Sequence, residues 1–373
     1  MLMKNYVFKK KSLKMTTLVI VFDAGARLEE KGKYGTMHLM EHLICKTFKD
    51  MYPELTKLGI SWNAFTSDEM VEVYFKGLDK YLTNDLKEKL ARRLVDGLGW
   101  VSEEEFETEK KVVCQEYADC MFSPESASTI NIMRKWFGVY TPIGYLEDIQ
   151  AFTYEDMLET YEKYFRRPAK ITEIGRVKTT AFEDFEYQDV TKLKDRVKFK
   201  NHKDMPLEEI SSDDKIPVFA VSKKTVSKSD YTYLGIGLDM LTDGLDSPFY
   251  VELREKLGLT YFVCTQINGY IDHGVMMIEA CTSNDRKDEL IEKMKEVIES
   301  AESFMTPERF DTVMSSIRIS REKQDALLFS DHNRFSTISK MLFPNNLNKI
   351  ELDKVIKVTL DYLSKTVVLT AND

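Results

Sequence analysis

The residues best suited to chemistry are two histidines four positions apart, His38 and His42, with Glu41 directly before the second. On a helix, positions i and i+4 lie on one face a turn apart, so both imidazoles can bind one metal ion. Glu41 stands where its carboxylate could take a proton from a water molecule at that ion. This HxxEH order reverses the HExxH helix of zinc proteases and uses the same geometry.

The simpler alternative is a surface helix that carries two histidines and an incidental glutamate. The chain contains only five histidines. By composition, an HxxEH arrangement therefore arises by chance with a probability of roughly 1% or less. We expect a metal site on this helix.

A catalytic zinc site needs a third protein ligand and leaves its fourth position to water. The best candidates are Glu109 and Glu116, on a helix expected to begin at the capping box of residues 102–105. They stand seven residues apart, two helical turns, and share a face with Val112 and Val113. Burying two carboxylates is costly unless a metal or hydrogen-bond donors hold them. Alone, this pattern favours a solvated face; together with the two histidines it favours a metal site.

The elements that must position these residues form two similar halves. In the first half we expect a strand, a helix, two strands and then several helices, beginning with residues 17–22, 34–49, 60–66 and 70–75. The second half repeats the order with residues 216–222, 247–257, 260–267 and 275–281. Two helices follow, one with apolar residues at helical period over 290–301 and one that Thr306 and Pro307 begin.

The hydrophilic stretch over residues 189–215 separates these halves and indicates a linker. We therefore expect a metal-binding domain over 1–190, a charged linker over 191–215 and a second, similar domain without the metal motif over 216–373. The predicted fold class is α+β, with a mostly antiparallel sheet in each domain and helices packed on one face.

Composition supports buried cores and excludes some partners. The 373 residues are 43% hydrophobic and 31% charged, with a net charge of −9. This acidic balance argues against nucleic acid and anionic membranes as partners. The longest apolar run, residues 18–22, is far below a membrane span, and no signal peptide is evident. Five cysteines without a CxxC pair indicate reduced thiols, and we expect a cytoplasmic protein.

These residues resemble the pitrilysin family of inverted-motif zinc peptidases, which includes insulin-degrading enzyme and the mitochondrial processing peptidases. The resemblance rests on the HxxEH motif, on a glutamate some seventy residues later, and on flanking segments at residues 23–29, 63–67, 143–144 and 153–157. It implies that His38, His42 and Glu116 bind one zinc ion per chain. It also implies that Glu109 supports the site from close by and that Asn63, Ala64 and Phe65 form a substrate-docking edge.

In the second half, residues 253–261 read LREKLGLTY and resemble the family's arginine–tyrosine signature. The resemblance implies that Arg254 and Tyr261 contact substrate; by themselves they would be a helix-surface charge and a half-buried strand residue. The chain departs from the family at Cys45-Lys46-Thr47-Phe48, where Phe-Lys-Gly-Thr is more usual, and at Thr141-Pro142, where His-Pro is frequent. These departures concern loop lengths and the substrate pocket.

The resemblance implies a zinc endopeptidase that hydrolyses unstructured peptides or processes a short protein segment. In that mechanism Glu41 is the general base, and Arg254 and Tyr261 stabilise the oxyanion. The family builds a clamshell from two such two-domain units, so a homodimer, or a heterodimer with a related subunit, is expected. Arg254 and Tyr261 would then come from the partner chain. The alternatives are a catalytically silent partner subunit and a metal-dependent lyase, such as S-ribosylhomocysteine lyase, which completes its site with a cysteine.

Overall fold

The computed structural model describes residues 7–9, 14–138, 141–175, 182–189, 196, 207, 215–326 and 350–371. The chain divides into two compact units. Met1–Asp119 and Val139–Phe199 form the first unit, and Cys120–Gly138 and Lys200–Asp373 form the second. Most of the linker predicted over 191–215 lies outside the described residues.

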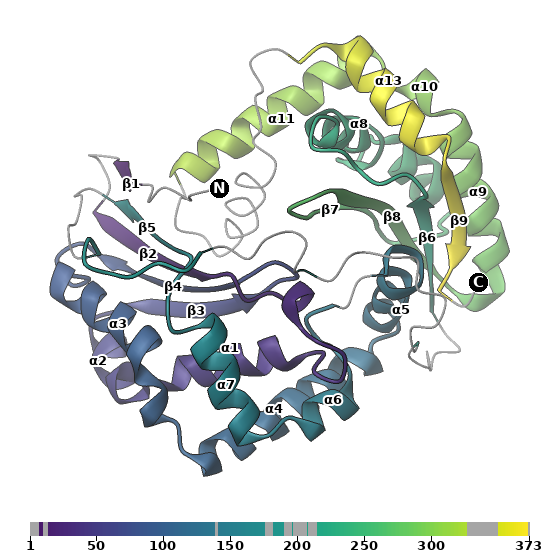
Figure 1. Ribbon diagram of the computed structural model, residues 1–373. Coiled ribbons are helices and arrows are strands. Elements are labelled where there is room, and N and C mark those ends of the chain that lie inside the picture. The colour runs from purple at the N-terminus through teal and green to yellow at the C-terminus, as the bar shows by residue number, and fades with distance from the viewer. Residues whose placement is uncertain are drawn as a thin grey trace. The chain divides into compact units, whose positions relative to one another are not determined.

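The first unit contains a mixed sheet in which the described strands follow the order β1-β5-β2-β4-β3 (Figure 1). Their bounds are β1 Val7–Lys9, β2 Met15–Phe22, β3 Ser61–Thr66, β4 Val71–Leu78 and β5 Lys170–Gly175. β1 runs parallel to β5, and the other neighbours are antiparallel. β3 therefore lies at one end of the described strand order.

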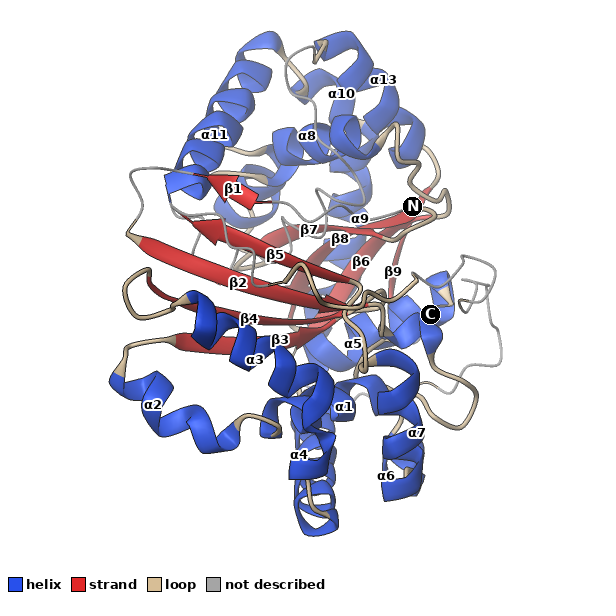
Figure 2. Ribbon diagram, turned by 60° about the vertical axis from the view of Figure 1, so that its left-hand side comes forward, coloured by secondary structure: helices blue, strands red, loops and turns tan. Residues whose placement is uncertain are grey.

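The helices of the first unit lie on one side of this sheet, below it in Figure 2. They are α1 Thr36–Lys46, α2 Tyr52–Lys57, α3 Asn84–Asp96, α4 Glu103–Phe122, α6 Leu146–Ala151 and α7 Tyr154–Tyr164, with short 3-10 helices η1 Ala26–Leu28, η2 Lys49–Met51 and η3 Gly97–Trp100. Leu18, Ile20 and Phe22 alternate along β2 and are fully buried. Phe22 contacts Phe165, at the end of α7, with ring centroids 5.2 Å apart. This alternation fixes the sheet face that the helices cover.

The second unit contains an antiparallel sheet with the described order β7-β8-β6-β9. Its strands are β6 Ile216–Ser222, β7 Val263–Gly269, β8 Gly274–Thr282 and β9 Thr366–Thr370. Its helices are α5 Pro124–Ile132, α8 Tyr231–Thr242, α9 Lys287–Glu299, α10 Ala301–Phe304, α11 Pro307–Ala326 and α13 Leu352–Leu363, with π-helices η4 Met133–Phe137 and η6 Tyr250–Glu255 and 3-10 helix η7 Asn284–Arg286.

Different helices pack on the two faces of the second sheet. Val218 and Ala220 of β6 belong to the same apolar cluster as Leu290 and Met294 of α9. Side chains alternate along a strand, so the intervening residues face the other way. On β8, that opposite face carries Cys281, whose Sγ lies 3.9 Å from Glu125 Oε1 of α5. A helix from the first half of the chain thus packs on the other face of the second sheet.

The predicted α+β class with two similar sheet domains is confirmed. The predicted strand at 216–222 matches β6, and the Ser102 and Thr306 helix starts are present, with side-chain to backbone distances of 3.3 and 3.2 Å. The helix expected over 247–257 is a shorter π-helix, η6, and β7 begins three residues after the expected start at residue 260. No helix in the described part of the chain is long and apolar enough to cross a membrane.

Candidate metal centre

The helix that carries the HxxEH motif begins at a glycine and has an acidic cap from outside the helix. Gly35 has a φ of 93°, a left-handed conformation that glycine adopts without strain, and provides no side-chain cap. Instead, the Glu29 carboxylate accepts hydrogen bonds from the backbone N–H groups of Gly35 at 2.9 Å and Met37 at 2.7 Å. These bonds satisfy donors that a helix start leaves unpaired. Burial raises the pKa of Glu29 to about 8, although both backbone hydrogen bonds lower it.

The segment before α6 fixes the entry of α1. A side chain at Gly144 would place its Cβ 2.2 Å from the Gly35 backbone, so the two glycines permit this approach. The backbone N–H of Tyr34 donates to Asp148 Oδ2 at 3.0 Å, and the Tyr145 N–H donates to the Tyr34 carbonyl at 3.3 Å. Two sequence segments more than a hundred residues apart therefore set the position of the motif helix.

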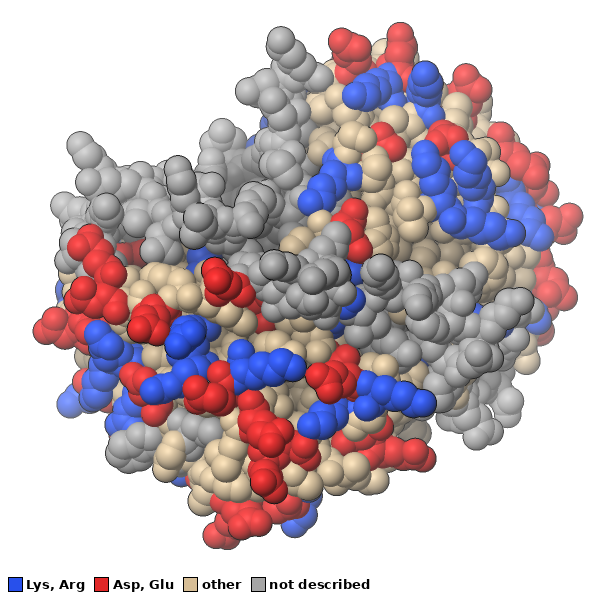
Figure 3. Space-filling view, viewed as in Figure 1, with Lys and Arg blue, Asp and Glu red and all other residues tan. Residues whose placement is uncertain are grey.

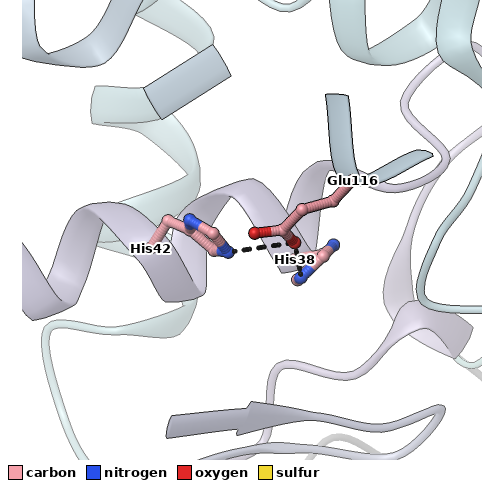
Figure 4. Close-up of side chains that lie close together, drawn as sticks. All are labelled: His38, His42 and Glu116. Atoms are coloured by element: carbon pink, nitrogen blue, oxygen red, sulfur yellow. Dashed lines mark ion pairs between the residues drawn. The ribbon is translucent and has the colours of Figure 1, made fainter. Parts of the chain in front are cut away.

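Three of the predicted ligands converge (Figure 4). The rings of His38 and His42 lie one turn apart on α1, with centroids 5.1 Å from each other. Glu116 extends from α4, and its Oε2 lies 3.4 Å from His38 Nε2 and 3.6 Å from His42 Nε2. One ligand atom from each residue lies within 4.8 Å of the others. Within the described residues, this is the one group of three such side chains.

The two nitrogen–oxygen separations of 3.4 and 3.6 Å fit a zinc ion. In a tetrahedral site with bonds of about 2.0–2.2 Å, neighbouring ligand atoms lie roughly 3.3–3.6 Å apart. The protonation state also fits, because burial and the neighbouring His42 lower the pKa of His38 to about 4. A neutral imidazole offers a lone pair to a metal. Two nitrogens and one carboxylate oxygen are a donor set that zinc accepts while retaining an open position.

Glu41 is oriented by a residue that the sequence alone did not single out for this role. Thr66, at the end of β3, donates a hydrogen bond from its hydroxyl to Glu41 Oε2 at 2.6 Å. Thr66 is 6% exposed, which holds the donor in one place. The edge strand and the motif helix are thus joined through the predicted base.

Glu109 contacts His42 at Nδ1, whereas Glu116 lies near Nε2 of the same ring. Its Oε2 lies 3.2 Å from His42 Nδ1, and its Oε1 lies 2.7 Å from Lys46 Nζ. The Glu109 side chain is only 10% exposed, whereas that of Glu116 is 44% exposed. Of the valines expected beside them, Val113 is buried, but Val112 is 40% exposed, so the prediction that both lie on the inward face was wrong for Val112. Val113 stands four residues after Glu109 and three before Glu116, which aligns it with both.

The predicted docking edge lies on β3, which contacts α1. Asn63 is exposed, Phe65 is half-buried, and Ala64 is 8% exposed. Asn63 pairs with Tyr74 and Phe65 with Glu72 on β4, the strand to one side of β3. On its other side, β3 is the last strand in the described strand order.

Arg254 and Tyr261 lie together in the second unit. The Arg254 guanidinium carbon is 4.6 Å from the ring centroid of Tyr261 and 4.7 Å from that of Tyr250. Tyr261 is 78% exposed. The second tyrosine was not predicted; its position four residues before Arg254, one helical turn, is the signal that could have identified it. The other predicted catalytic and metal-binding residues belong to the first unit.

Comparison with known proteins gives two family matches that follow the two halves of the chain. A family model described as Insulinase (Peptidase family M16) matches residues 6–139, which include His38, Glu41, His42 and Glu116. A second, described as Peptidase M16 inactive domain, matches residues 151–317, which include Arg254 and Tyr261. Together the two models match most of the chain.

Two relatives match this chain over most of their own lengths. An uncharacterized zinc protease of Rickettsia bellii (strain RML369-C) is 21% identical, and the match covers 95% of this chain and 88% of the relative. The uncharacterized zinc protease YmxG of Bacillus subtilis (strain 168) is 23% identical, and the match covers 89% of this chain and 86% of the relative. The structure is similar to that of a protease from Helicobacter pylori, with a TM-score of 0.75 and 17% identity over 97% of this chain and 95% of that one. This chain belongs to peptidase family M16.

Proposed function

We propose that this protein is a zinc-dependent endopeptidase that hydrolyses unstructured peptides. The observation that carries the proposal is the convergence of His38, His42 and Glu116 at separations that suit one zinc ion. When bound, zinc would lower the pKa of water toward neutrality and polarise a peptide carbonyl. The names of the relatives, several of which are zinc proteases, support the choice of metal.

Glu41 is the proposed general base. It would take a proton from the attacking water and return it to the leaving amine. The hydrogen bond from Thr66 supports this role because it fixes the Glu41 carboxylate beside His42. Thr66 donates this hydrogen bond to Oε2 of the Glu41 carboxylate.

The proposed substrate is an extended peptide that adds to the edge of β3 beside Asn63, Ala64 and Phe65. Backbone hydrogen bonds along such an edge give affinity without strict sequence choice. We further propose that Arg254 and Tyr261 donate hydrogen bonds to the substrate and that the active protein is a homodimer in which they come from the partner chain. In Figure 3, Lys and Arg side chains lie among Asp and Glu side chains on the face in view. Together with the net charge of −9, this supports peptides over nucleic acids as partners.

Two variants test the proposal. Glu41→Gln should retain a full equivalent of zinc and lose peptide cleavage by about 100-fold or more, because the base is removed and the ligands remain. Glu116→Ala should lose bound zinc. Metal content is measured after dialysis, and cleavage by mass spectrometry of an unfolded peptide. Wild-type turnover by Glu41→Gln would contradict the role of Glu41, and full zinc occupancy in Glu116→Ala would contradict the ligand set.

A further inference from the structure

Lys46 lies at the end of α1, one helical turn beyond His42. Its ammonium forms an ion pair with Glu109 Oε1 at 2.7 Å. The other oxygen of the same carboxylate lies 3.2 Å from His42 Nδ1. Lys46, Glu109 and His42 therefore form a chain of contacts that ends at a nitrogen of the candidate metal ligand.

Because Glu109 is nearly buried, the orientation of its carboxylate depends on its contacts with Lys46 and His42. The Glu109 side chain is 10% exposed, and a carboxylate removed from water needs donors for both oxygens. His42 can supply one hydrogen bond only through Nδ1–H, which leaves the Nε2 lone pair for a metal. Without Lys46, the Glu109 carboxylate would lose its fixed orientation and could turn toward solvent. The ring of His42 would then lose the partner that sets its tautomer.

We infer that Lys46 is a positioning residue of the metal centre: it holds Glu109 in the orientation that accepts a hydrogen bond from His42 Nδ1–H and so directs Nε2 toward the metal. This inference rests on the proposed zinc site. Partners that orient a metal-binding histidine typically change metal affinity by about 10- to 100-fold. Lys46 acts one contact further out, through the Glu109 carboxylate.

The chain provides a matched control in Lys49. Lys49 forms an ion pair with Glu105, which also joins the end of the α1 region to α4. Its side chain is 40% exposed, comparable to the 31% of Lys46. Among the described residues, the polar partners of Glu105 are Lys49 and Ser102, and neither is a histidine. Lys46 and Lys49 therefore differ in what their acidic partners contact.

The experiment measures the zinc dissociation constant of the full chain by competition with a chromophoric chelator. Lys46→Met should weaken zinc binding by about 10- to 100-fold, while Lys46→Arg, which keeps the charge, should stay within a few-fold of wild type. Lys49→Met should bind zinc as wild type does. In a Glu109→Ala background, Lys46→Met should cause no further loss, because the residue through which it acts is gone.

The outcomes separate this inference from the proposed function. Unchanged zinc affinity in Lys46→Met, equal losses in Lys46→Met and Lys49→Met, or an additive loss in the Glu109→Ala background would overturn the role of Lys46 and leave the zinc site intact. A wild-type chain that binds no zinc would overturn both. Thermal unfolding of the metal-free variants is measured alongside, and a role limited to stability would change the melting temperature without changing the zinc affinity of the folded chain.

Discussion

Three glutamates near the motif histidines have three different surroundings. The Glu116 side chain is 44% exposed and contacts both histidines. Glu109 is nearly buried and contacts His42 and Lys46. Glu41 accepts a hydrogen bond from Thr66. The sequence predicted Glu41 from its motif, and spacing plus family resemblance predicted the other two. It did not predict Thr66, Lys46 or Glu29 in these roles, because each acts through a contact with a residue on another element.

The hydrogen bond to the proposed base gives a residue-scale prediction. Thr66→Val keeps the shape of the side chain and removes the donor, so kcat should fall by about tenfold, the value of one hydrogen bond to a charged group. Zinc content should not change, and Thr66→Ser, which restores the hydroxyl, should recover most of the activity. A Thr66→Val enzyme with wild-type kcat would show that Glu41 needs no such partner.

At the scale of elements, local signals identified most of the helices and strands around the site. Alternating or continuous apolar residues predicted β2, β3, β4, β6 and β8, and capping residues predicted the starts of α4 and α11. Helix α8 was not predicted, because Gly235 and Gly237 lower its helix propensity. Gly237 has a tertiary reason: a Cβ there would lie 1.8 Å from Thr359 Oγ1 of α13. β5 was also missed, because its sequence KITEIG has only two strongly apolar residues, Ile171 and Ile174, and does not alternate.

The acidic cap of α1 gives a prediction at this scale. Glu29→Ala leaves two helix-start N–H groups without their acceptor and should lower the free energy of unfolding by about 1–2 kcal/mol. It should also weaken zinc binding, because His38 lies in the first turn of α1. The neighbouring Glu30→Ala removes a side chain that is 73% exposed and should change neither quantity. Urea unfolding of both variants measures this, and equal midpoints would contradict a capping role for Glu29.

The packing of α5 on the second sheet predicts a pH dependence of stability. Burial, and then the nearby Glu125, raise the pKa of Glu279 from 4.5 to about 7. Folding therefore favours the protonated form of Glu279, and its contribution to stability is present below about pH 4.5 and lost as the pH rises through about 7. Glu279→Gln cannot ionise, so it should gain stability over wild type between pH 5 and pH 8, by up to roughly 3 kcal/mol.

Urea unfolding at both pH values measures this difference for Glu279→Gln. Glu299→Gln, at an exposed position at the end of α9, is the control and should show the same pH dependence as wild type. A constant difference between Glu279→Gln and wild type at the two pH values would contradict the protonation of Glu279 in the folded state.

At the scale of the whole molecule, the predicted functional residues divide between the two units. The candidate metal ligands and Glu41 belong to the first, and Arg254, which contacts the rings of Tyr250 and Tyr261, belongs to the second. The repeat of elements made two domains predictable from sequence. The assignment of Cys120–Gly138 to the second unit was not predictable, because α5 has no local feature that distinguishes it from the helices of the first half.

The proposed dimer predicts complementation between two inactive variants. If Arg254 acts on the metal site of the partner chain, a heterodimer of Glu41→Gln and Arg254→Ala contains one complete site. After equal amounts are mixed and subunits exchange, peptide cleavage should return to about one quarter of wild type, since half of the dimers are mixed and each has one site of two. Absence of any recovery in a mixture shown to exchange would indicate that each chain completes its own site.

The proposed function requires one zinc ion, which His38, His42 and Glu116 hold and on which peptide hydrolysis depends. The most direct measurement is a zinc titration of the metal-free protein, with cleavage of an unfolded peptide mixture followed by mass spectrometry. Cleavage should rise in proportion to bound zinc and stop rising at one equivalent per chain, while Glu41→Gln binds the same equivalent without cleavage. Full occupancy of wild type without any cleavage, or cleavage that persists in the metal-free protein, would contradict it.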